Sequence, residues 1–412
     1  MSWKAKLYLA AVYLTGLLVV FCAFDNVDKN LALIIILWVI IGIPFEIRSI
    51  RVSTDSHFTL SFAIYLLLII IYGYWTTIIV AALISIIVDL IEKRGLIKLL
   101  FNFNQISVSI FLTGQVFYLF KKSFDIFTLP DDLLAFFLAT LMYIISNNFL
   151  VAAIISLTVK RNIFSVIGLD FKMVILYFSA LAPMSMLMVL LYKEQPLTML
   201  LILPPLALAH TSLSNYVSLK AETRKTLEIL ADFVDCRDHY TAEHSKRVTE
   251  YASAIAEEMG IDDAIKELIE LAGRVHDLGK IAVRDSILLN PNPLTSSEME
   301  VMKTHPDIAY NMLKRLNMYR IGSIIVREHH ERYDGNGYPK GLKSKNIHIG
   351  ARIISVADAF DAMTSDRPYR KAMTEKEAIE ELKRNAGTQF DPAVVEAFLK
   401  VLAKKRGQLE VN

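Results

Sequence analysis

The sequence predicts an all-α protein in which a polytopic bundle of membrane helices precedes a soluble helical half. Up to about Asn215, leucine, isoleucine, valine and phenylalanine dominate, and apolar runs of the roughly 20 residues needed to cross a bilayer recur. From Lys220 onward, the composition is that of an ordinary charged, soluble, helical chain. Strand signals are absent, so we expect helices to account for both halves.

Composition supports this division of the 412-residue chain. A hydrophobic fraction of 54% is too high for one soluble globule and is unevenly distributed. The formal net charge of +2 gives no reason to propose nucleic-acid binding. Cys22 and Cys236 fall in different halves, so no disulfide framework is implied. We expect a membrane domain over 1–214, a connector over 215–237 and a soluble domain over 238–412.

The first half contains about eight expected membrane spans. They lie near residues 7–24, 31–47, 58–73, 74–91, 101–120, 133–159, 173–192 and 197–216. The third and fourth spans join tightly at Gly73 and Tyr74. No small-residue cleavage pattern stands out near the N-terminus, so we do not expect a cleavable signal peptide.

The loops between the expected spans differ in charge, which predicts the orientation of the bundle. The basic residues of one set of loops are Lys4, Lys6, Arg48, Arg51, Lys93, Arg94, Lys98, Lys160, Arg161 and Lys172. The opposite loops hold only Lys29, Lys121, Lys122 and Lys193 as basic residues. The first set is therefore expected in the cytoplasm. Eight spans then place both termini and the soluble half there as well.

Polar side chains also occur at or inside the expected spans: Asn102, Asn104, Gln105, Asn147 and Asn148. Hydrogen bonds between helices are the simpler interpretation, and a ligand pocket is the alternative. Glu46 and Asp89 lie near span ends, where interfacial placement is expected. We find no coupled intramembrane site of the kind that transport requires.

The connector over 215–237 contains neither proline nor glycine and predicts an unbroken helix. A semi-apolar stripe repeats along it at alternating spacings of three and four: Leu219, Thr223, Thr226, Leu230 and Phe233. This stripe has two interpretations. The helix forms a parallel homodimer that passes a signal from membrane to soluble domain, or it packs on the core of its own soluble domain.

Seven further helices are expected in the soluble half. They are Thr241–Met259, Asp262–Val275, Ser296–Leu316, Tyr319–Arg332, Gly350–Thr364, Thr374–Asn385 and Asp391–Lys405. The adjacent pair His276 and Asp277 ends the second of these helices. It offers a nitrogen and a hard oxygen ligand from one short piece of chain. His244 and Asp358 lie on two other helices and complete a set of four possible metal ligands.

A second set of candidate ligands consists of His305, His329 and His330, with Asp277 bridging the two sets. Any one of these histidines alone is more often a surface or hydrogen-bonded core residue. Together, mixed imidazole and carboxylate ligands suit Fe, Mn or Zn rather than Mg or Ca. Two such cations side by side suit hydrolysis of a phosphodiester.

The soluble half resembles the HD-GYP family, the HD-superfamily phosphohydrolases that act on cyclic di-GMP. The resemblance runs from about Asp238 to Leu399, through 238–248, 276–280, 329–339, 357–370 and 387–392, and includes His276-Asp277 and Gly337-Tyr338-Pro339. It implies a membrane-anchored bacterial enzyme of the cell (inner) membrane that opens cyclic di-GMP to linear pGpG, and on to GMP in a second step. The stretch from Phe58 to Tyr118 resembles membrane sensor domains that precede such enzymes.

The resemblance also implies roles for individual residues. His244, His276, Asp277 and Asp358 would hold one metal, and Asp277, His305, His329 and His330 the other. Lys280 would protonate or bind the leaving phosphate oxygen, and Tyr338, Arg367 and Arg370 would contact the dinucleotide.

The sequence also departs from the family pattern. Some members carry a glutamate for a third metal where this chain has Tyr240, so we expect two metals. Glu243 stands where glycine is common, and Ala309 where glycine is usual. Two alternatives stay open: a non-catalytic cyclic di-GMP receptor, and a generic HD-type nucleotide phosphohydrolase. The complete ligand set with Lys280 argues against the first alternative, and the Gly337-Tyr338-Pro339 loop against the second.

Overall fold

The computed structural model describes residues 1–47, 50–51, 57–123, 127–159, 163–237, 243–290, 292–366 and 371–409. The chain forms two compact units, Met1–Leu219 and Lys220–Asn412. The predicted all-α class is confirmed, with one small addition: strand β1, Ile50–Arg51, pairs antiparallel with strand β2, His57–Phe58. The boundaries predicted at 214 and 237 stay predictions.

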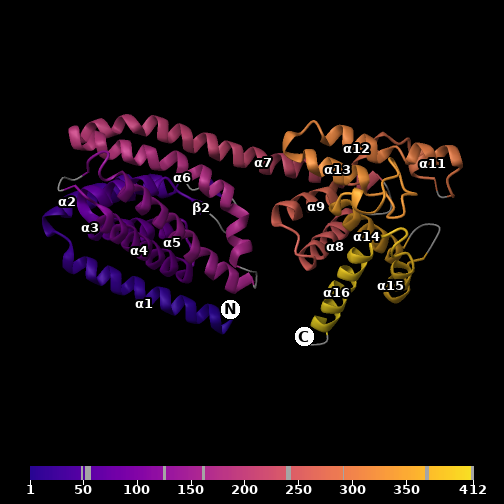
Figure 1. The fold of residues 1–412 in the computed structure, drawn as a ribbon, viewed down its shortest axis with the longest axis horizontal. Helices are drawn as coiled ribbons and strands as arrows, with labels where there is room; N and C mark the ends of the chain where they lie inside the picture. The colour runs from indigo at the N-terminus through magenta and orange to yellow at the C-terminus, as the bar shows by residue number, and fades with distance from the viewer. Residues whose placement is uncertain are drawn as a thin grey trace. The chain divides into compact units, whose positions relative to one another are not determined.

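The first unit is a bundle of long apolar helices (Figure 1). Its elements are α1 Trp3–Asn26, η1 Lys29–Leu31, α2 Ala32–Ile47, α3 Ser61–Ile91, α4 Leu96–Phe120, α5 Leu133–Val159, α6 Ile163–Glu194, η2 Pro196–Ile202 and the start of α7, Leu203–Arg237. Helix α4 packs on α1, α3 and α5, and α6 packs on α3 and α5. Large apolar side chains such as Leu14 and Phe21 face outward, as expected of helices that lipid surrounds.

Among the described residues, seven helices are long and apolar enough to cross a membrane, one fewer than the eight spans predicted. The difference lies in α3, which spans both the third and the fourth predicted segments. Gly73 interrupts it with a φ of 82° and a ψ of 159°, at the predicted junction. The part of α3 before Gly73 is much shorter than the roughly 20 residues that a span needs. By its length alone, it is therefore not counted as a separate membrane span.

Contacts show that the chain reverses direction at Gly73. Phe62 and Val88 line one cavity of about 630 Å³, whereas a straight helix would separate them by roughly 40 Å. Tyr118, near the end of α4, donates a hydrogen bond to the carbonyl of Ile69, close to Gly73, at 3.3 Å. Helix α3 is therefore two antiparallel segments, and both of its ends lie at the start of α4.

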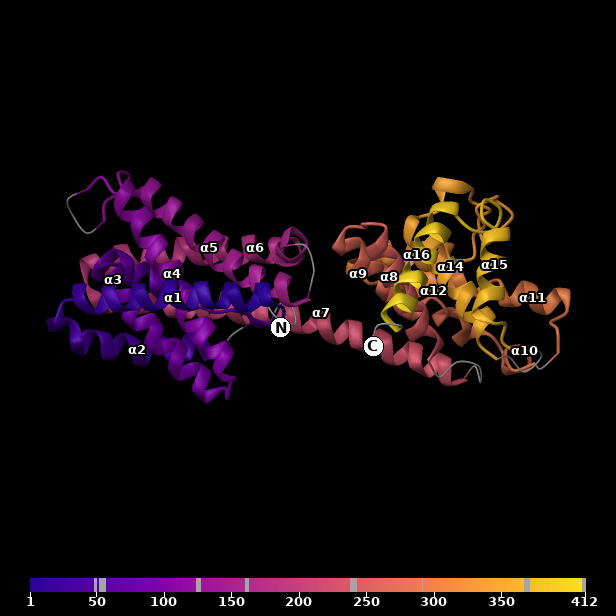
Figure 2. The same ribbon diagram turned by 90° about the horizontal axis from the view of Figure 1, so that it is seen from below.

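The second unit surrounds its core with shorter helices (Figures 1 and 2). They are α8 His244–Glu258, α9 Asp263–Val275, η3 Leu278–Ala282, α10 Asp285–Leu288, α11 Ser296–Met302, α12 His305–Leu313, η4 Asn317–Tyr319, α13 Arg320–Glu328, η5 Ser344–Asn346, α14 Ile349–Thr364, α15 Glu375–Arg384 and α16 Pro392–Leu409. Helix α14 is central, because it packs on α8, α9, α13, α15 and α16.

One predicted helix of this unit, Ser296–Leu316, is wrong. The chain instead forms two helices, α11 and α12, separated at Lys303 and Thr304. Pro306 has no N–H to continue a helix from the preceding turn, but it fits the first turn of a new one. The break places His305 at the start of α12.

Helix α7 settles which face of the connector packs on the soluble core. Leu227, Ala231 and Val234 are buried in that core. On the predicted stripe, Leu230 is 36% exposed and Phe233 62% exposed. The helix therefore does pack on its own domain, but through a different face from the predicted stripe.

Candidate metal centre

A close approach of two chain segments creates the centre. The pair His276 and Asp277 lies between α9 and η3, and His305 begins α12. A Cβ added at Gly279 would lie 1.9 Å from the carbonyl oxygen of His305, so only glycine lets η3 and α12 approach this closely. As a result, Asp277 Oδ1 lies 3.4 Å from His305 Nε2.

The first ligand cluster consists of His244, His276 and Asp358, whose ligand atoms lie within 4.8 Å of one another. His244 Nε2 lies 3.3 Å from Asp358 Oδ1, and His276 Nε2 lies 4.0 Å from the same oxygen. These side chains come from α8, the end of α9 and α14. The predicted first set therefore does meet in space.

The second ligand cluster consists of His305, His329 and His330, within the same distance limit. Asp277 lies between the two clusters, because its Oδ2 is 3.5 Å from His276 Nε2 while its Oδ1 faces His305. His276, Asp277 and His329 form a third overlapping group of possible ligands. This geometry suits a carboxylate that bridges two cations.

Backbone hydrogen bonds orient three of the imidazole rings. The Nδ1 atoms of His276, His305 and His329 lie 2.9, 2.8 and 2.6 Å from the carbonyl oxygens of Gly273, Met302 and Val326. An Nδ1–H that donates to a carbonyl leaves Nε2 with a lone pair for a metal. Within the described part of the chain, these three Nε2 atoms are buried without a hydrogen-bond partner. The residues therefore fit divalent transition-metal ions.

A carboxylate orients the fourth ring. His244 Nδ1 lies 2.7 Å from Asp361 Oδ2, and Arg247 Nε donates to Asp361 Oδ1 at 2.6 Å. Asp361 follows Asp358 by one helical turn on α14, so both carboxylates reach the same ring. Asp361 was not among the site residues predicted from sequence. Asp361 lies three residues after the candidate ligand Asp358, and this helical spacing could have indicated from sequence that it faces the same centre.

Burial and neighbouring charges set the ionisation of the centre. Burial lowers the pKa of His305, and burial with the nearby His305 lowers that of His330 to about 3. Burial opposes the charged form of His244, but hydrogen bonds to Asp358 and Asp361 raise its pKa to about 10. Burial likewise opposes ionisation of Asp277, yet Lys280 and the histidines hold its pKa well below the usual range. The second cluster thus presents neutral imidazoles.

Lys280 and Tyr338 both lie at the edge of this centre, and their predicted roles toward the substrate stay predictions. Lys280 Nζ lies 2.6 Å from Asp277 Oδ2. The Tyr338 ring centroid lies 4.8 Å from that of His330, and Lys303 Nζ lies 5.9 Å from the Tyr338 ring. Lys303 was not among the residues predicted from sequence. Arg367, Arg370 and Tyr240 lie outside the described residues, so their predicted roles stay predictions.

The loop that carries Tyr338 is held by a buried acid. Glu331 accepts hydrogen bonds from the backbone N–H groups of Lys340 and Leu342 at 2.7 and 2.9 Å. A Cβ added at Gly337 would lie 2.2 Å from the Arg332 nitrogen, so this position requires glycine. Tyr338 therefore reaches His330 from a tightly folded turn.

The end of α7 contacts the segments that carry ligands. Arg237 donates to the carbonyls of Ile281 and Val283 at 3.0 and 2.8 Å, just beyond Lys280. Ser245, next to His244, donates to Asp235 at 2.9 Å. The helix that leaves the membrane domain is therefore bonded to both η3 and α8.

We predict that Asp361→Asn weakens metal binding at the first cluster by about 10- to 100-fold, because it removes the carboxylate that orients His244. Titration of the metal-free protein with Mn against a competing chelator measures the loss. The second cluster should keep its affinity. Glu380→Gln, on the exposed face of α15, serves as a matched control. Wild-type affinity at both clusters in Asp361→Asn would contradict the assigned role.

Comparisons with known proteins match the two units separately. Residues 228–394 match the family model of the HD domain, and residues 18–218 match the model MASE9. The chain spans about half the length of the first curated relatives that it matches, 54% and 49%.

Three relatives illustrate the similarity over the HD domain. The cyclic di-GMP phosphodiesterase response regulator RpfG of Xanthomonas campestris is 41% identical over 207 residues, which cover 50% of this chain and 54% of that protein. A cyclic di-GMP phosphodiesterase of Thermotoga maritima is 44% identical, over 43% of this chain and 49% of its own. The 3'3'-cGAMP-specific phosphodiesterase 3 of Vibrio cholerae is 36% identical, over 41% and 37%. Residues 228–394 are thus similar to the HD domain, in its HD-GYP-like form, and residues 18–218 are similar to the MASE9 membrane domain that precedes it.

Proposed function

We propose that this protein is a membrane-anchored, metal-dependent phosphodiesterase that hydrolyses cyclic di-GMP to linear pGpG, with GMP as the product of a second hydrolysis. The observation that carries the proposal is the pair of buried ligand clusters that share Asp277. The relatives named as cyclic di-GMP phosphodiesterases support the choice of substrate.

The chemistry divides between cations and protein. Two divalent cations, when bound, supply an acidified water and neutralise phosphate charge. Fe, Mn or Zn suits the mixed imidazole and carboxylate ligands. Asp277 sets the spacing of the two clusters. Lys280, ion-paired with Asp277, is placed to hold a proton for the leaving phosphate oxygen. Tyr338 forms one wall where a nucleotide base would stack, and Arg367 and Arg370 are proposed to pair with the phosphates.

Three alternative functions of the site predict different assay results. The relative named for 3'3'-cGAMP supports that cyclic dinucleotide as the second candidate substrate. A non-catalytic receptor would not need Lys280 against Asp277 in a complete ligand set. A generic nucleotide phosphohydrolase would not need the turn that brings Tyr338 to His330. Parallel assays on cyclic di-GMP, 3'3'-cGAMP and GMP-class mononucleotides separate these readings.

We also propose that both termini and the catalytic domain are cytoplasmic, in a multi-pass protein of the cell (inner) membrane. The charge difference between the loops supports this orientation. The reversal at Gly73 supports it too, because α3 then returns to the side from which it started. The lipid bilayer and cyclic di-GMP are thus the proposed partners, without nucleic acid.

The connector is proposed to form a homodimer and to carry regulation from the membrane domain. Leu230 and Phe233, spaced as in a coiled-coil seam, are exposed on α7 beside the face that packs on the core. Arg237 on α7 donates to the carbonyls of Ile281 and Val283, and Ser245 donates to Asp235 on α7. These bonds support transmission of a movement of α7 to the candidate metal ligands.

We predict that Asp277→Ala lowers the rate of cyclic di-GMP hydrolysis by about 100-fold or more. Mutation of residues that only hydrogen-bond to metal ligands typically costs about 10- to 100-fold in activity, and loss of a bridging ligand should cost more. Product formation by chromatography and metal content measure the effect. Glu396→Ala, on the exposed face of α16, is the control. Full activity with full metal content in Asp277→Ala would rule out the two-metal arrangement.

Elemental analysis should give about two metals per chain, since Tyr240 replaces the glutamate that supports a third. His305→Ala should reduce the value towards one, and Tyr240→Glu should raise it towards three. Three metals bound reproducibly to the unchanged protein would show that another residue supplies the missing ligand.

Helix phase in the connector should set the phosphodiesterase rate. One residue inserted between Lys220 and Arg224 rotates everything that follows by roughly 100°, and seven nearly restore the phase. In full-length protein in membranes, the single insertion should change the rate and the seven-residue insertion should largely restore it. Equal thermal stability of the variants excludes misfolding. Unchanged rates in both would show that α7 is only a tether.

A further inference from the structure

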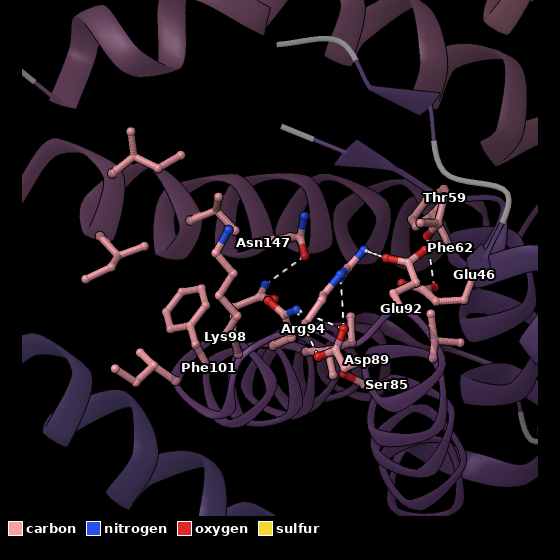
Figure 3. A pocket seen from close by; sticks show the side chains of 18 of the residues that line it. Glu46, Thr59, Phe62, Ser85, Asp89, Glu92, Arg94, Lys98, Phe101 and Asn147 are labelled. Atoms are coloured by element: carbon pink, nitrogen blue, oxygen red, sulfur yellow. Dashed lines mark hydrogen bonds and ion pairs between the residues drawn. The ribbon is translucent and has the colours of Figure 1, made fainter. Parts of the chain in front are cut away.

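The membrane domain contains a cavity of about 630 Å³, which is within the range of small-molecule sites. Side chains from α1 to α6 line it, and Figure 3 shows Phe62 beside Thr59 and Glu46, with Arg94 near Asp89 and Glu92. Polar and charged groups between membrane helices are costly and usually serve a site. The alternative that the sequence left open, a ligand pocket, therefore has structural support, although Gln105 also donates to Asn147 on the neighbouring helix at 2.7 Å.

The acids that line the cavity are not equivalent. Arg94 pairs with Asp89 at 2.8 Å and with Glu92 at 2.5 Å, and Asn102 donates to Asp89 at 3.0 Å (Figure 3). Asp89 is thus compensated within the protein.

Glu46 has different surroundings. Thr59 donates a hydrogen bond to its Oε2 at 3.0 Å, and no ion pair joins it to a basic side chain in the part of the chain that the structure describes. The single guanidinium at this end of the cavity, among the described side chains, is shared between the other two acids. A buried carboxyl without a paired cation is costly in its charged form, so a cation bound beside Glu46 would stabilise it as a carboxylate.

Aromatic rings form the wall beside Glu46. The Phe62 ring centroid lies 4.9 Å from that of Tyr143 and 4.6 Å from that of Phe178. Tyr65 and Tyr177 also line the cavity. Aromatic faces together with a carboxylate favour an ammonium group, because the ring quadrupole attracts a cation within about 6 Å.

We propose that this cavity binds a small organic cation, with its ammonium group at Glu46 and its organic body against Phe62, Tyr143 and Phe178. The proposal is independent of the phosphodiesterase activity. The ammonium group belongs either to a free amine or to a lipid headgroup such as that of phosphatidylethanolamine.

Three probes of similar size and different charge test the site: benzylamine, benzyl alcohol and benzoate. The full-length protein is held in phosphatidylglycerol nanodiscs, which contain no ammonium group, and binding is measured by ligand-detected NMR. Protonated benzylamine should bind, and benzyl alcohol and benzoate should bind at least about tenfold more weakly, as expected for the loss of a charged hydrogen bond. No benzylamine binding, or equal binding of all three probes, overturns the proposal without any variant.

Variants then locate the site. Glu46→Gln should weaken benzylamine binding about tenfold or more and leave benzyl alcohol unchanged. Glu194→Gln, an exposed acid at the end of α6, should behave as the unchanged protein. Benzylamine affinity within twofold of the unchanged protein in Glu46→Gln overturns the assignment. If added phosphatidylethanolamine competes with benzylamine, the natural ammonium group belongs to a lipid headgroup. If it does not compete, the natural ligand is a free amine.

Discussion

The position of Asp277 between two sets of histidines is the constraint on which the candidate metal centre depends. Its two oxygens face different clusters, so the spacing of the clusters follows from one side chain. That position requires η3 and α12 to approach until no side chain fits at Gly279. A buried carboxylate among apolar helices would be costly alone, and Lys280 and the surrounding imidazoles offset that cost.

The environment of the ligands divides them into two kinds. Backbone carbonyls orient His276, His305 and His329, so their geometry is built into the helix ends that carry them. His244 instead depends on Asp361 and Arg247, two side chains from separate helices. The first cluster is therefore more sensitive to movement between α8 and α14. Ser245 links α8 to Asp235 on α7, so the same cluster adjoins the connector.

In the membrane unit, too, a buried carboxylate must be compensated by neighbouring groups. Its apolar helices can tolerate Asp89 because Arg94 and Asn102 surround it. Glu46 lies in the same cavity and accepts a hydrogen bond from the Thr59 hydroxyl, and no ion pair joins it to a cation among the described residues. The reversal at Gly73 brings the two ends of α3 together, and this is what places the residues around Thr59 opposite those around Asp89.

Sequence alone determined the all-α class and the division into a membrane and a soluble half, because hydropathy and helical period are local properties of the chain. Seven candidate ligands were also predicted from sequence, and the structure brings them together around Asp277. The sequence also located the break at Gly73, but not the separation of α11 from α12, where a proline begins a new helix. Only the tertiary structure decided which residues meet. Asp361, Arg247, Lys303 and the contacts of Arg237 join segments far apart in the chain, and Glu46 gains its significance from the positions of neighbouring helices. Such pairings depend on packing, and no local pattern in the sequence records them.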